Sequence, residues 1–281
     1  MSPNLTIRTF QISISTDQAS TATDFWIDSL RSLRASRTKK QFSLQAHTQS
    51  IIYELFGNGS DTRSCPLIKA SLLVAQRMQS EALLAQEPRY HNQWHTADVL
   101  SGSAALLKAE RQRSGQVVDT WEKALILSAV SHDFMHPGGV NKHPFEIEQR
   151  SLTYVRNLWL GGGLSEQETE RIKQLILHTD VSTVPDNHRR INGRVFEFDL
   201  DWTTVLMNEA DIAASCSPEF GPLLDQDLAQ EWRDAGHWKS DHQVTSQDRQ
   251  QFLKSVVFSS PASVILGWPV MVKSQLKDKP S

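Results

Sequence analysis

Histidine and aspartate residues cluster in four short strings of the sequence. These residues are the candidates for metal binding or for acid–base chemistry. The two longer ones read Tyr-His-Asn-Gln-Trp-His-Thr-Ala-Asp-Val at 90–99 and His-Asp-Phe-Met-His-Pro-Gly at 132–138. The shorter ones are Thr-Asp at 179–180 and Ala-Asp-Ile at 210–212. Neutral imidazoles and carboxylates are ligands that zinc, iron and manganese accept, so the combination favours a divalent-metal site.

In the first string, two histidines are four residues apart. If the segment is helical, His91 and His95 lie one turn apart on the same helix face. Such a pair alone is weak evidence, since histidines at this spacing more often have a structural or solvated role.

The second string is more specific because it ends an apolar helical run. Residues 124–131 are almost continuously apolar, and His132 and Asp133 follow directly. Two polar groups at the inner end of a core helix must be paired or metal-bound, because burying them unpaired costs several kcal/mol. Asp133 has two oxygens and could bridge two ions. His136 follows one turn later, just before Pro137 stops the helix.

Asp211 also lies within an apolar helical run, between residues 205–207 and 212–214. An unpaired carboxylate is costly in such a place, so Asp211 is either a metal ligand on a second helix or the partner of an Arg or Lys from a neighbouring helix. Taken alone, the residue leaves both roles open.

The elements that must position these residues are helices. Apolar residues recur at helical spacing, with turns at Gly57–Gly59, Pro137–Gly139, Gly161–Gly163 and Pro185–Gly193. The expected helices begin near Thr23 and run over 51–56, 68–78, 91–107, 119–130, 166–178, 203–214 and 218–235, with Ser165 as a helix start. We therefore expect an all-α fold: a compact multi-helix domain with an N-terminal helical subregion.

Length and composition predict one domain of an ordinary globular protein. With 281 residues, 39% hydrophobic and 22% charged, the chain can bury a sizeable core. We expect an extended or strand-like arm over 1–22, one helical domain over 23–270 and a tail over 271–281. The apolar stretch at 262–272 is expected to pack in the core.

Net charge, cysteine content and hydropathy limit the partners and the compartment that we expect. A net charge of −3 offers no basic field for nucleic acid, and the two cysteines are too few for a disulfide framework. No signal peptide and no apolar run of membrane-spanning length is visible, so we expect a cytoplasmic protein without nucleic-acid or membrane partners. A homodimer is left open.

The order of the strings resembles the HD-domain metal-dependent phosphohydrolases, an all-helical superfamily whose ligands come from separate helices. Within it, the sequence is similar to class I cyclic nucleotide phosphodiesterase catalytic domains, as a divergent, bacterial-like member. These carry Tyr-His-Asn-x-x-His-x-x-Asp-Val and His-Asp-x-x-His-Pro-Gly, and Asn141 falls at the family's position after the second string. The Thr-Asp and Ala-Asp strings resemble the remaining signatures. The resemblance covers residues 88–236.

The resemblance implies a role for each matching position. The implied ligands of the first metal ion are His95, His132, Asp133 and Asp211. Asp133 would also reach a second ion, and His91 would be the acid that protonates the leaving oxygen. Residues implied to orient ligands or waters, or to lie near the second ion, are His136, Asp98, Asp180 and Thr179. For Asp98 and Asp180, ordinary pairing on a helix surface is equally open. The implied cofactors are two divalent ions, Zn²⁺ first and Mg²⁺ or Mn²⁺ second.

Two parts of the family pattern are missing. An Asn-His-His string and a Glu that help organise the second metal are expected between His136 and Thr179, and the string is absent. Glu146 or Glu148 could replace that Glu, although a solvated face is favoured for both.

The family's purine pocket pairs a Gln with a Phe three residues later. Here Arg249 lies three residues before Phe252, so Gln250 or Gln251 could serve only with a change of register. In the alternative, Phe252 simply faces the core. The substrate-binding residues expected from the resemblance are Tyr90, Asn141, Gln250, Gln251 and Phe252.

The resemblance implies hydrolysis of 3',5'-cyclic nucleotides, cAMP or cGMP, to 5'-monophosphates by a metal-bridging hydroxide, with a small-molecule nucleotide as substrate. Two alternatives remain at this point. One is an HD-type phosphohydrolase acting on another phosphodiester or a phosphomonoester. The other is an inactive metal-binding sensory module, which the retained His91 disfavours because such a module needs no proton donor.

Overall fold

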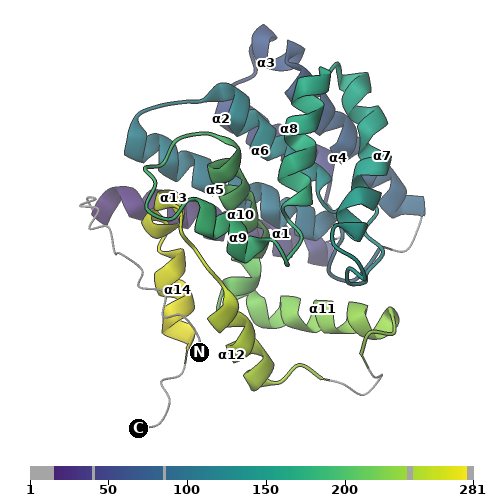
Figure 1. Ribbon diagram of the computed structural model, residues 1–281, viewed down its shortest axis with the longest axis vertical. Coiled ribbons are helices and arrows are strands. Elements are labelled where there is room, and N and C mark those ends of the chain that lie inside the picture. Colours follow the sequence, from purple (N-terminus) through teal and green to yellow (C-terminus); the bar gives the residue numbers. More distant parts are fainter. Residues whose placement is uncertain (1–15, 40–41, 85–86, 239–242, 277–281) are drawn as a thin grey trace.

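The chain folds into helices joined mostly by short loops (Figure 1). The structure is a computed structural model that describes residues 16–39, 42–84, 87–238 and 243–276. These residues contain no strand, which confirms the all-α expectation. Their helices are α1 Thr16–Lys39, α2 Leu44–Phe56, α3 Ser60–Ser64, α4 Pro66–Leu84, α5 Gln93–Ser114, α6 Asp119–Ser131, α7 Glu146–Gly162, α8 Glu166–Leu177, α9 Val184–Arg190, α10 Leu200–Cys216, α11 Gly221–Asp234, α12 Ser246–Ser255, α13 Pro261–Ile265 and α14 Trp268–Gln275.

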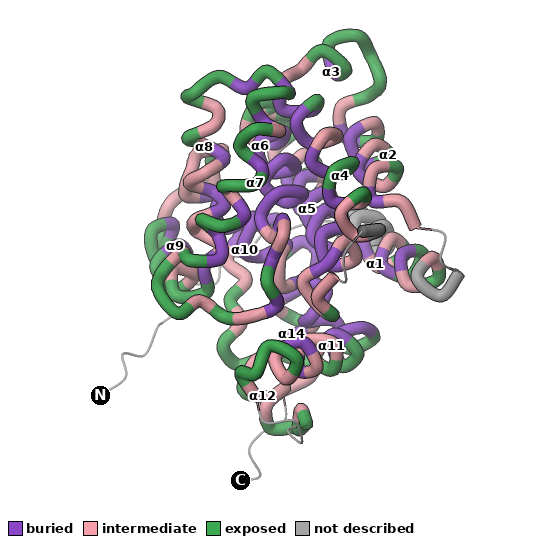
Figure 2. The backbone as a smooth tube through the Cα atoms, turned by 90° about the vertical axis from the view of Figure 1, so that its right-hand side faces the viewer, coloured by how far each residue is buried: buried purple, intermediate pink, exposed green. Residues whose placement is uncertain are grey.

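Helix α5 runs through the centre of the molecule, where the tube in Figure 2 is almost continuously buried. Apart from His95 and Asp98, its residues 95–107 are small or apolar on every side, and a helix of that composition is stable only when other helices surround it. Helices α1, α2, α6, α10 and α13 pack around it. At Gly102 a Cβ would lie 3.2 Å from the backbone oxygen of Ala210, so the glycine lets α10 approach α5 closely.

Local sequence signals explain several helix ends. Ser165 caps α8 in a capping box with Glu168, as the expected helix start required. Helix α2 ends at Gly57, whose φ of +73° suits glycine. Around residue 267 the apolar C-terminal segment divides into α13 and α14, and Trp268 is fully buried there, which confirms the expected core packing.

Other boundaries differ from expectation. The stretch from Pro185 to Gly193 was expected to be a loop, but Val184–Arg190 forms α9. Its Asn187 side chain donates to the carbonyl oxygen of His178 and to Asn208 Oδ1, at 2.9 Å each, so tertiary hydrogen bonds stabilise a helix that its composition does not favour. Helix α7 continues through Gly162, so the expected loop begins only at Gly163.

The expected arm and tail are only partly within the described residues. Helix α1 begins at Thr16, so 16–22 are helical rather than extended, and 1–15 lie outside the described part. Residues 271–275 of the expected tail belong to α14, and 277–281 lie outside. The division into arm, domain and tail stays a prediction. Within the described residues, no helix has the length and apolar character needed to cross a bilayer.

Candidate metal centre and active site

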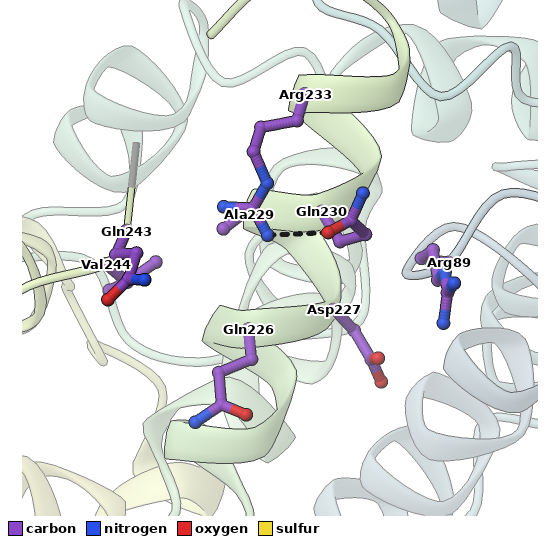
Figure 3. A pocket seen from close by; sticks show the side chains of 8 residues that line it. All are labelled: Arg89, Gln226, Asp227, Ala229, Gln230, Arg233, Gln243 and Val244. Atoms are coloured by element: carbon purple, nitrogen blue, oxygen red, sulfur yellow. Dashed lines mark hydrogen bonds between the residues drawn. The ribbon is translucent and has the colours of Figure 1, made fainter. Parts of the chain in front are cut away.

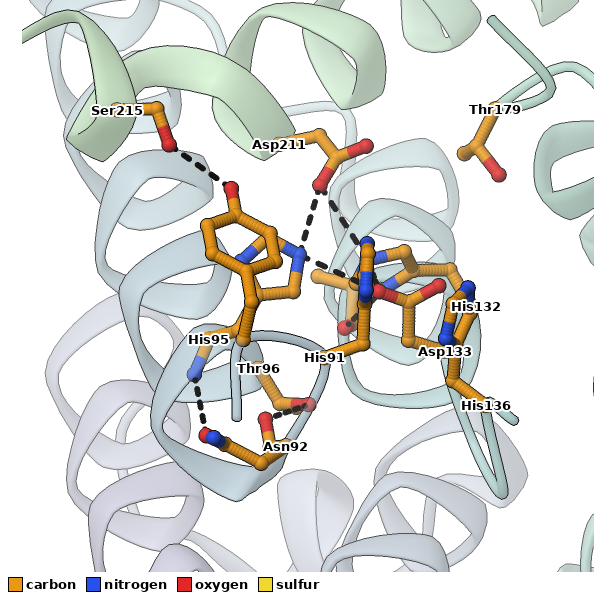
Figure 4. A network of polar contacts seen from close by, with 12 residues as sticks. His91, Asn92, His95, Thr96, His132, Asp133, His136, Thr179, Asp211 and Ser215 are labelled. Carbon is orange, nitrogen blue, oxygen red and sulfur yellow. Dashed lines mark hydrogen bonds and ion pairs between the residues drawn. The ribbon is translucent and has the colours of Figure 1, made fainter. Parts of the chain in front are cut away.

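Four side chains from three helices converge at one point beside α5 (Figure 4). His95 projects from α5, His132 and Asp133 stand at the end of α6, and Asp211 comes from α10. His95 Nε2 lies 3.0 Å from Asp211 Oδ1 and 3.3 Å from Asp133 Oδ2. His132 Nε2 lies 3.2 Å from the same Asp133 oxygen and 3.4 Å from the same Asp211 oxygen. The structure therefore brings together the four ligands implied by the resemblance.

The tautomer of the neutral His132 ring is the one that a metal ligand needs. Its Nδ1 lies 3.0 Å from the carbonyl oxygen of Ala129 in its own helix, so Nδ1 carries the hydrogen and donates it. Its buried Nε2 therefore carries no hydrogen in the neutral ring and faces the Asp133 and Asp211 oxygens, at 3.2 and 3.4 Å. A nitrogen lone pair directed at two carboxylates is favourable when a proton or a cation lies between them. With two imidazoles and two carboxylates, the donor set fits a divalent cation.

The electrostatics of the cluster point the same way. Burial opposes protonation of His95, but hydrogen bonds and charges from Asp133 and Asp211 outweigh it and raise the pKa of His95 to about 9. The pKa of Asp211 is held well below its usual range, where burial is outweighed by the bonds and charges of the two histidines. The carboxylates thus hold protons on the imidazoles, and a bound cation would replace these protons.

His91 lies beside this cluster, but not on the helix of His95. Asn92 caps α5 by accepting hydrogen bonds from the amides of Trp94 and His95, so the helix begins at Gln93. The expectation that His91 and His95 share one helix face is therefore wrong. The His91 and His95 ring centroids are nevertheless 5.6 Å apart, because the turn before the cap folds His91 back toward the cluster.

Glu231 of α11 holds His91, and sequence reasoning missed it. His91 Nδ1 pairs with Glu231 Oε1, and the other oxygen, Oε2, accepts from the amides of Tyr90 at 2.7 Å and His91 at 2.9 Å. Burial acts to raise the pKa of Glu231, but His91 and these amides outweigh it and lower the pKa. A sequence signal exists, since Glu231 lies seven residues after buried Leu224 and so on the inner face of α11.

His136 stacks on His91, with ring centroids 3.8 Å apart and planes inclined by 24°. The chain leaves helical geometry at Met135, whose φ is +59°, and this turns His136 back over His91. Gly138 N donates to His136 Nδ1 at 3.0 Å, so Nε2 carries the hydrogen of the neutral ring. Burial, helped by the nearby His91, lowers the pKa of His136 to about 3.

His91, His136 and Glu231 have potential ligand atoms within 4.8 Å of one another. A cation must lie in the plane of each imidazole that binds it, and two stacked rings have no shared in-plane point between them. His136 Nδ1 is also occupied by the Gly138 amide. The stacking of the two rings therefore does not suit a cation bound by both histidines.

Asp98, expected to orient ligands, is paired elsewhere. It is buried, and Arg34 of α1 donates to both of its oxygens, at 2.6 and 3.2 Å. The ion pair ties the N-terminal helix to α5, one turn beyond His95. The N-terminal region, which the sequence left without a role beyond packing, thus reaches the helix that carries a candidate ligand.

Asn141, Glu148 and Asp180 form one network near the centre. Asn141 Nδ2 donates to Glu148 Oε2 at 2.9 Å and to Asp180 Oδ2 at 3.1 Å. Asn141 thus holds its own loop against these two carboxylates. Asp180 Oδ2 also accepts from the amide of Phe145 at 2.7 Å. Glu148 is buried, so the solvated face favoured from sequence is wrong for this residue, whereas Glu146 is exposed as expected. Burial raises the pKa of Glu148, and the negative charges of Asp180 and Asp133 add to the rise. The hydrogen bond from Asn141 acts in the opposite direction.

Thr179 lies at the edge of the same region (Figure 4). Its hydroxyl donates to the carbonyl oxygen of Ile176 at 2.8 Å. That bond leaves the oxygen lone pairs of Thr179 free to accept a further hydrogen bond.

A cavity of about 200 Å³ adjoins the metal cluster between α10, α11 and α12. Tyr90 and Phe252, both expected to bind substrate, line it, and so does Arg249. Gln250 and Gln251 do not. Gln250 donates to the carbonyl oxygen of Gln275 at 2.9 Å, and Gln251 is exposed. The register change that would bring either glutamine into the pocket has not occurred.

Comparisons with known proteins agree with this fold and these strings. Residues 90–156 match the 3'5'-cyclic nucleotide phosphodiesterase family. No curated protein matches significantly. The structure of LmjPDEB1 in complex with IBMX is similar over 94% of this chain and 95% of its own, with a TM-score of 0.66 and 14% identity.

A second solved structure has the same fold. It is the phosphodiesterase domain of the RhoPDE fusion protein from the choanoflagellate Salpingoeca rosetta, which is similar over 95% of this chain and 92% of its own, with a TM-score of 0.57 and 15% identity. At such identities the likeness concerns the fold, and the family match adds the two longer strings. The resemblance to class I cyclic nucleotide phosphodiesterase catalytic domains is thus confirmed, by a family match at residues 90–156 and by the fold of nearly the whole chain.

Proposed function

We propose that the protein hydrolyses 3',5'-cyclic nucleotides to 5'-nucleoside monophosphates. The observation that carries the proposal is the His91–Glu231 pair, placed beside the convergent cluster of His95, His132 and their two aspartates. Cleavage of a phosphodiester whose leaving group is an alkoxide needs a proton donor next to a divalent-cation site, and this arrangement would supply both.

His91 is proposed to donate the proton to the leaving oxygen. Glu231 accepts the hydrogen of His91 Nδ1, so Nε2 is the nitrogen that would deliver a proton to the leaving oxygen. His136, stacked on His91 and kept neutral by burial, adds no competing positive charge next to it. The amides of Tyr90 and His91, held by the same carboxylate, fix the ring's position.

The cluster residues are proposed to hold two divalent cations. His95, His132, Asp133 and Asp211 would hold the first, Zn²⁺, and Asp133 would share the second, Mg²⁺ or Mn²⁺. Thr179, Asp180, Asn141 and Glu148 would lie near the second ion. When bound, such ions lower the pKa of a water towards neutrality and neutralise charge on the phosphate. The network around Asn141 keeps Glu148 and Asp180 in fixed positions there.

A defined substrate panel tests the proposal. Metal content is measured on the purified protein, and turnover is measured with cAMP, cGMP, bis(p-nitrophenyl) phosphate and p-nitrophenyl phosphate. We expect turnover of cyclic nucleotides, its loss in His91→Ala, and loss of both metal and turnover in Asp211→Ala. Cleavage of the monoester alone would refute the proposal. Full metal content and activity in Asp211→Ala would refute the ligand assignment.

One observation favours a second candidate, an HD-type hydrolase of another phosphoester. Arg249 stands in the pocket where the resemblance leads one to expect a glutamine, so a base, if one binds, is read differently. A protein that cleaves bis(p-nitrophenyl) phosphate but no cyclic nucleotide would support this alternative.

A further inference from the structure

The cavity beside the metal cluster has walls suited to a flat heterocycle. It lies beside the centre, because Tyr90 in its wall packs on the rings of His91 and His95, with centroids 4.7 Å apart in each pair, and shares a 2.8 Å hydrogen bond with Ser215. Aromatic and aliphatic side chains form most of its wall, and such pockets bind planar ring systems. The wall residues with large apolar surfaces are Tyr90, Leu224, Leu228, Trp232, Trp238 and Phe252.

Arg249 lines the same cavity, and both of its terminal nitrogens donate to the protein. Its Nη1 donates to Asp225 Oδ2 at 2.8 Å and to the carbonyl oxygen of Ser215 at 3.3 Å. Its Nη2 donates to the carbonyl oxygen of Ser217 at 3.2 Å and to Gln275 Oε1 at 2.9 Å. Both terminal nitrogens therefore serve the protein, and Arg249 positions Asp225 rather than reading a ligand.

Asp225, in the wall of the same cavity, retains hydrogen-bonding capacity. Its Oδ2 accepts one bond from Arg249, and among the described residues its Oδ1 has no hydrogen-bond partner. A carboxylate has about four lone-pair sites across its two oxygens, so Asp225 can still accept two parallel N–H bonds from a ligand. The ion pair with Arg249 at 2.8 Å favours the charged, acceptor-only form of Asp225, although burial, the larger influence, raises its pKa.

We infer that Asp225 reads the base of the substrate and selects guanine over adenine, an inference that rests on the proposed function. Guanine presents N1–H and N2–H side by side, and two parallel donors match a carboxylate. Adenine offers one donor, N6–H, next to the acceptor N1, and that acceptor would face a carboxylate oxygen. Two acceptors placed against each other repel, and this rejects the wrong base as effectively as good contacts favour the right one.

The unsubstituted protein tests the inference without any risk of misfolding. Values of kcat/KM are measured for 3',5'-cyclic GMP, 3',5'-cyclic AMP and 3',5'-cyclic IMP, which keeps guanine's N1–H and O6 but lacks its 2-amino group. We expect cyclic GMP to exceed cyclic AMP by about tenfold or more, with cyclic IMP between them. Equal values for cyclic GMP and cyclic AMP, or a preference for cyclic AMP, would overturn the inference.

Substitution of Asp225 adds a second, independent readout. Asp225→Asn replaces one acceptor by a donor at nearly constant shape, so the ratio of cyclic GMP to cyclic AMP should fall about tenfold through KM. Bis(p-nitrophenyl) phosphate has no base, so its turnover should fall less than that of cyclic GMP. The matched control is Asp227→Asn on the same helix, because Asp227 lines a separate polar cavity of about 410 Å³ (Figure 3). A fall for the aryl diester equal to that for cyclic GMP, or an unchanged base ratio in folded Asp225→Asn, would overturn the assignment.

Failure of the proposed function has a different signature from failure of this inference. If the aryl diester is cleaved and no cyclic nucleotide is, the proposed function is wrong and Asp225 has no base to read. If cyclic nucleotides are cleaved without the expected order, the function stands and the assignment of Asp225 falls.

Discussion

Replacing Glu231 by Gln should disable His91 while leaving the metal cluster intact. The carboxylate is buried and accepts three hydrogen bonds, one from the His91 ring and two from backbone amides. In Glu231→Gln the amide oxygen satisfies the two backbone donors, so the amide nitrogen faces His91 Nδ1. An imidazolium would then place one N–H against another.

The size of the effect follows from that single contact. A hydrogen bond to a charged group contributes about 1.5–3 kcal/mol, so its loss should slow any step in which His91 donates a proton by about 10- to 100-fold. Cyclic nucleotides need that proton because an alkoxide leaves. Bis(p-nitrophenyl) phosphate does not, because nitrophenolate leaves as a stable anion.

The assay compares kcat for the two substrates at equal metal content. We expect Glu231→Gln to lose about 10- to 100-fold on the cyclic nucleotide and less than about twofold on the aryl diester. Asp234→Asn, an exposed change on the same helix, is the matched control. Equal losses on both substrates would show that Glu231 supports the fold or the metal instead, and no loss on either would refute the role of His91.

Three further outcomes are expected. Metal binding should weaken as the pH falls, because His95, whose pKa is raised to about 9 in the metal-free protein, must release its proton before it can bind an ion. Zinc titrations at pH 7 should therefore show buffer-dependent heats, and buffer-independent heats would contradict this. Glu209, whose pKa burial raises from 4.5 to about 7, is stabilising in its protonated form, so its contribution is complete below pH 4.5 and is lost as the pH rises through 7. Urea unfolding should show about 2.5 kcal/mol less stability at pH 8 than at pH 5 from this group, and Glu209→Gln should remove that difference. Gly162→Ala should destabilise the fold by roughly 1–3 kcal/mol, because the added Cβ would lie 2.8 Å from the backbone nitrogen of Ala70. Gly161→Ala is the control and should not destabilise the fold, since no neighbour lies closer than 4.0 Å to its Cβ. Equal Tm values for the two variants would refute this prediction.

Helix content was predictable because local chemistry agrees with tertiary packing over most of the chain. Apolar periodicity marked the buried faces, and a capping residue such as Ser165 marked a helix start. Prediction failed where distant partners decide the local structure. Helix α9 depends on the bonds of Asn187 to other segments, and no pattern within its seven residues indicates them.

In the candidate site, too, some residues could be predicted from local sequence and others depend on distant partners. Residues in the strings could be singled out because a polar group that follows a core helix, such as His132, is conspicuous in one dimension. Glu231 lies far along the chain from His91 in a polar helix, and only its place on the inner face distinguishes it. Glu148 was misjudged for a related reason. Its charged neighbours suggested solvent, but it shares a helix face with buried Ser151 and Val155.

The close approach of α11 to α10 constrains how relatives of this chain can diverge. A Cβ at Gly221 would collide with the guanidinium of Arg249 and with the carbonyl oxygen of Ser215. The contact with Ser215 involves the backbone, so position 221 must stay glycine whatever residue stands at 249, although Gly221 does not line the cavity. Residue 249, and with it the chemistry of the cavity wall, can then change without a matching change at position 221.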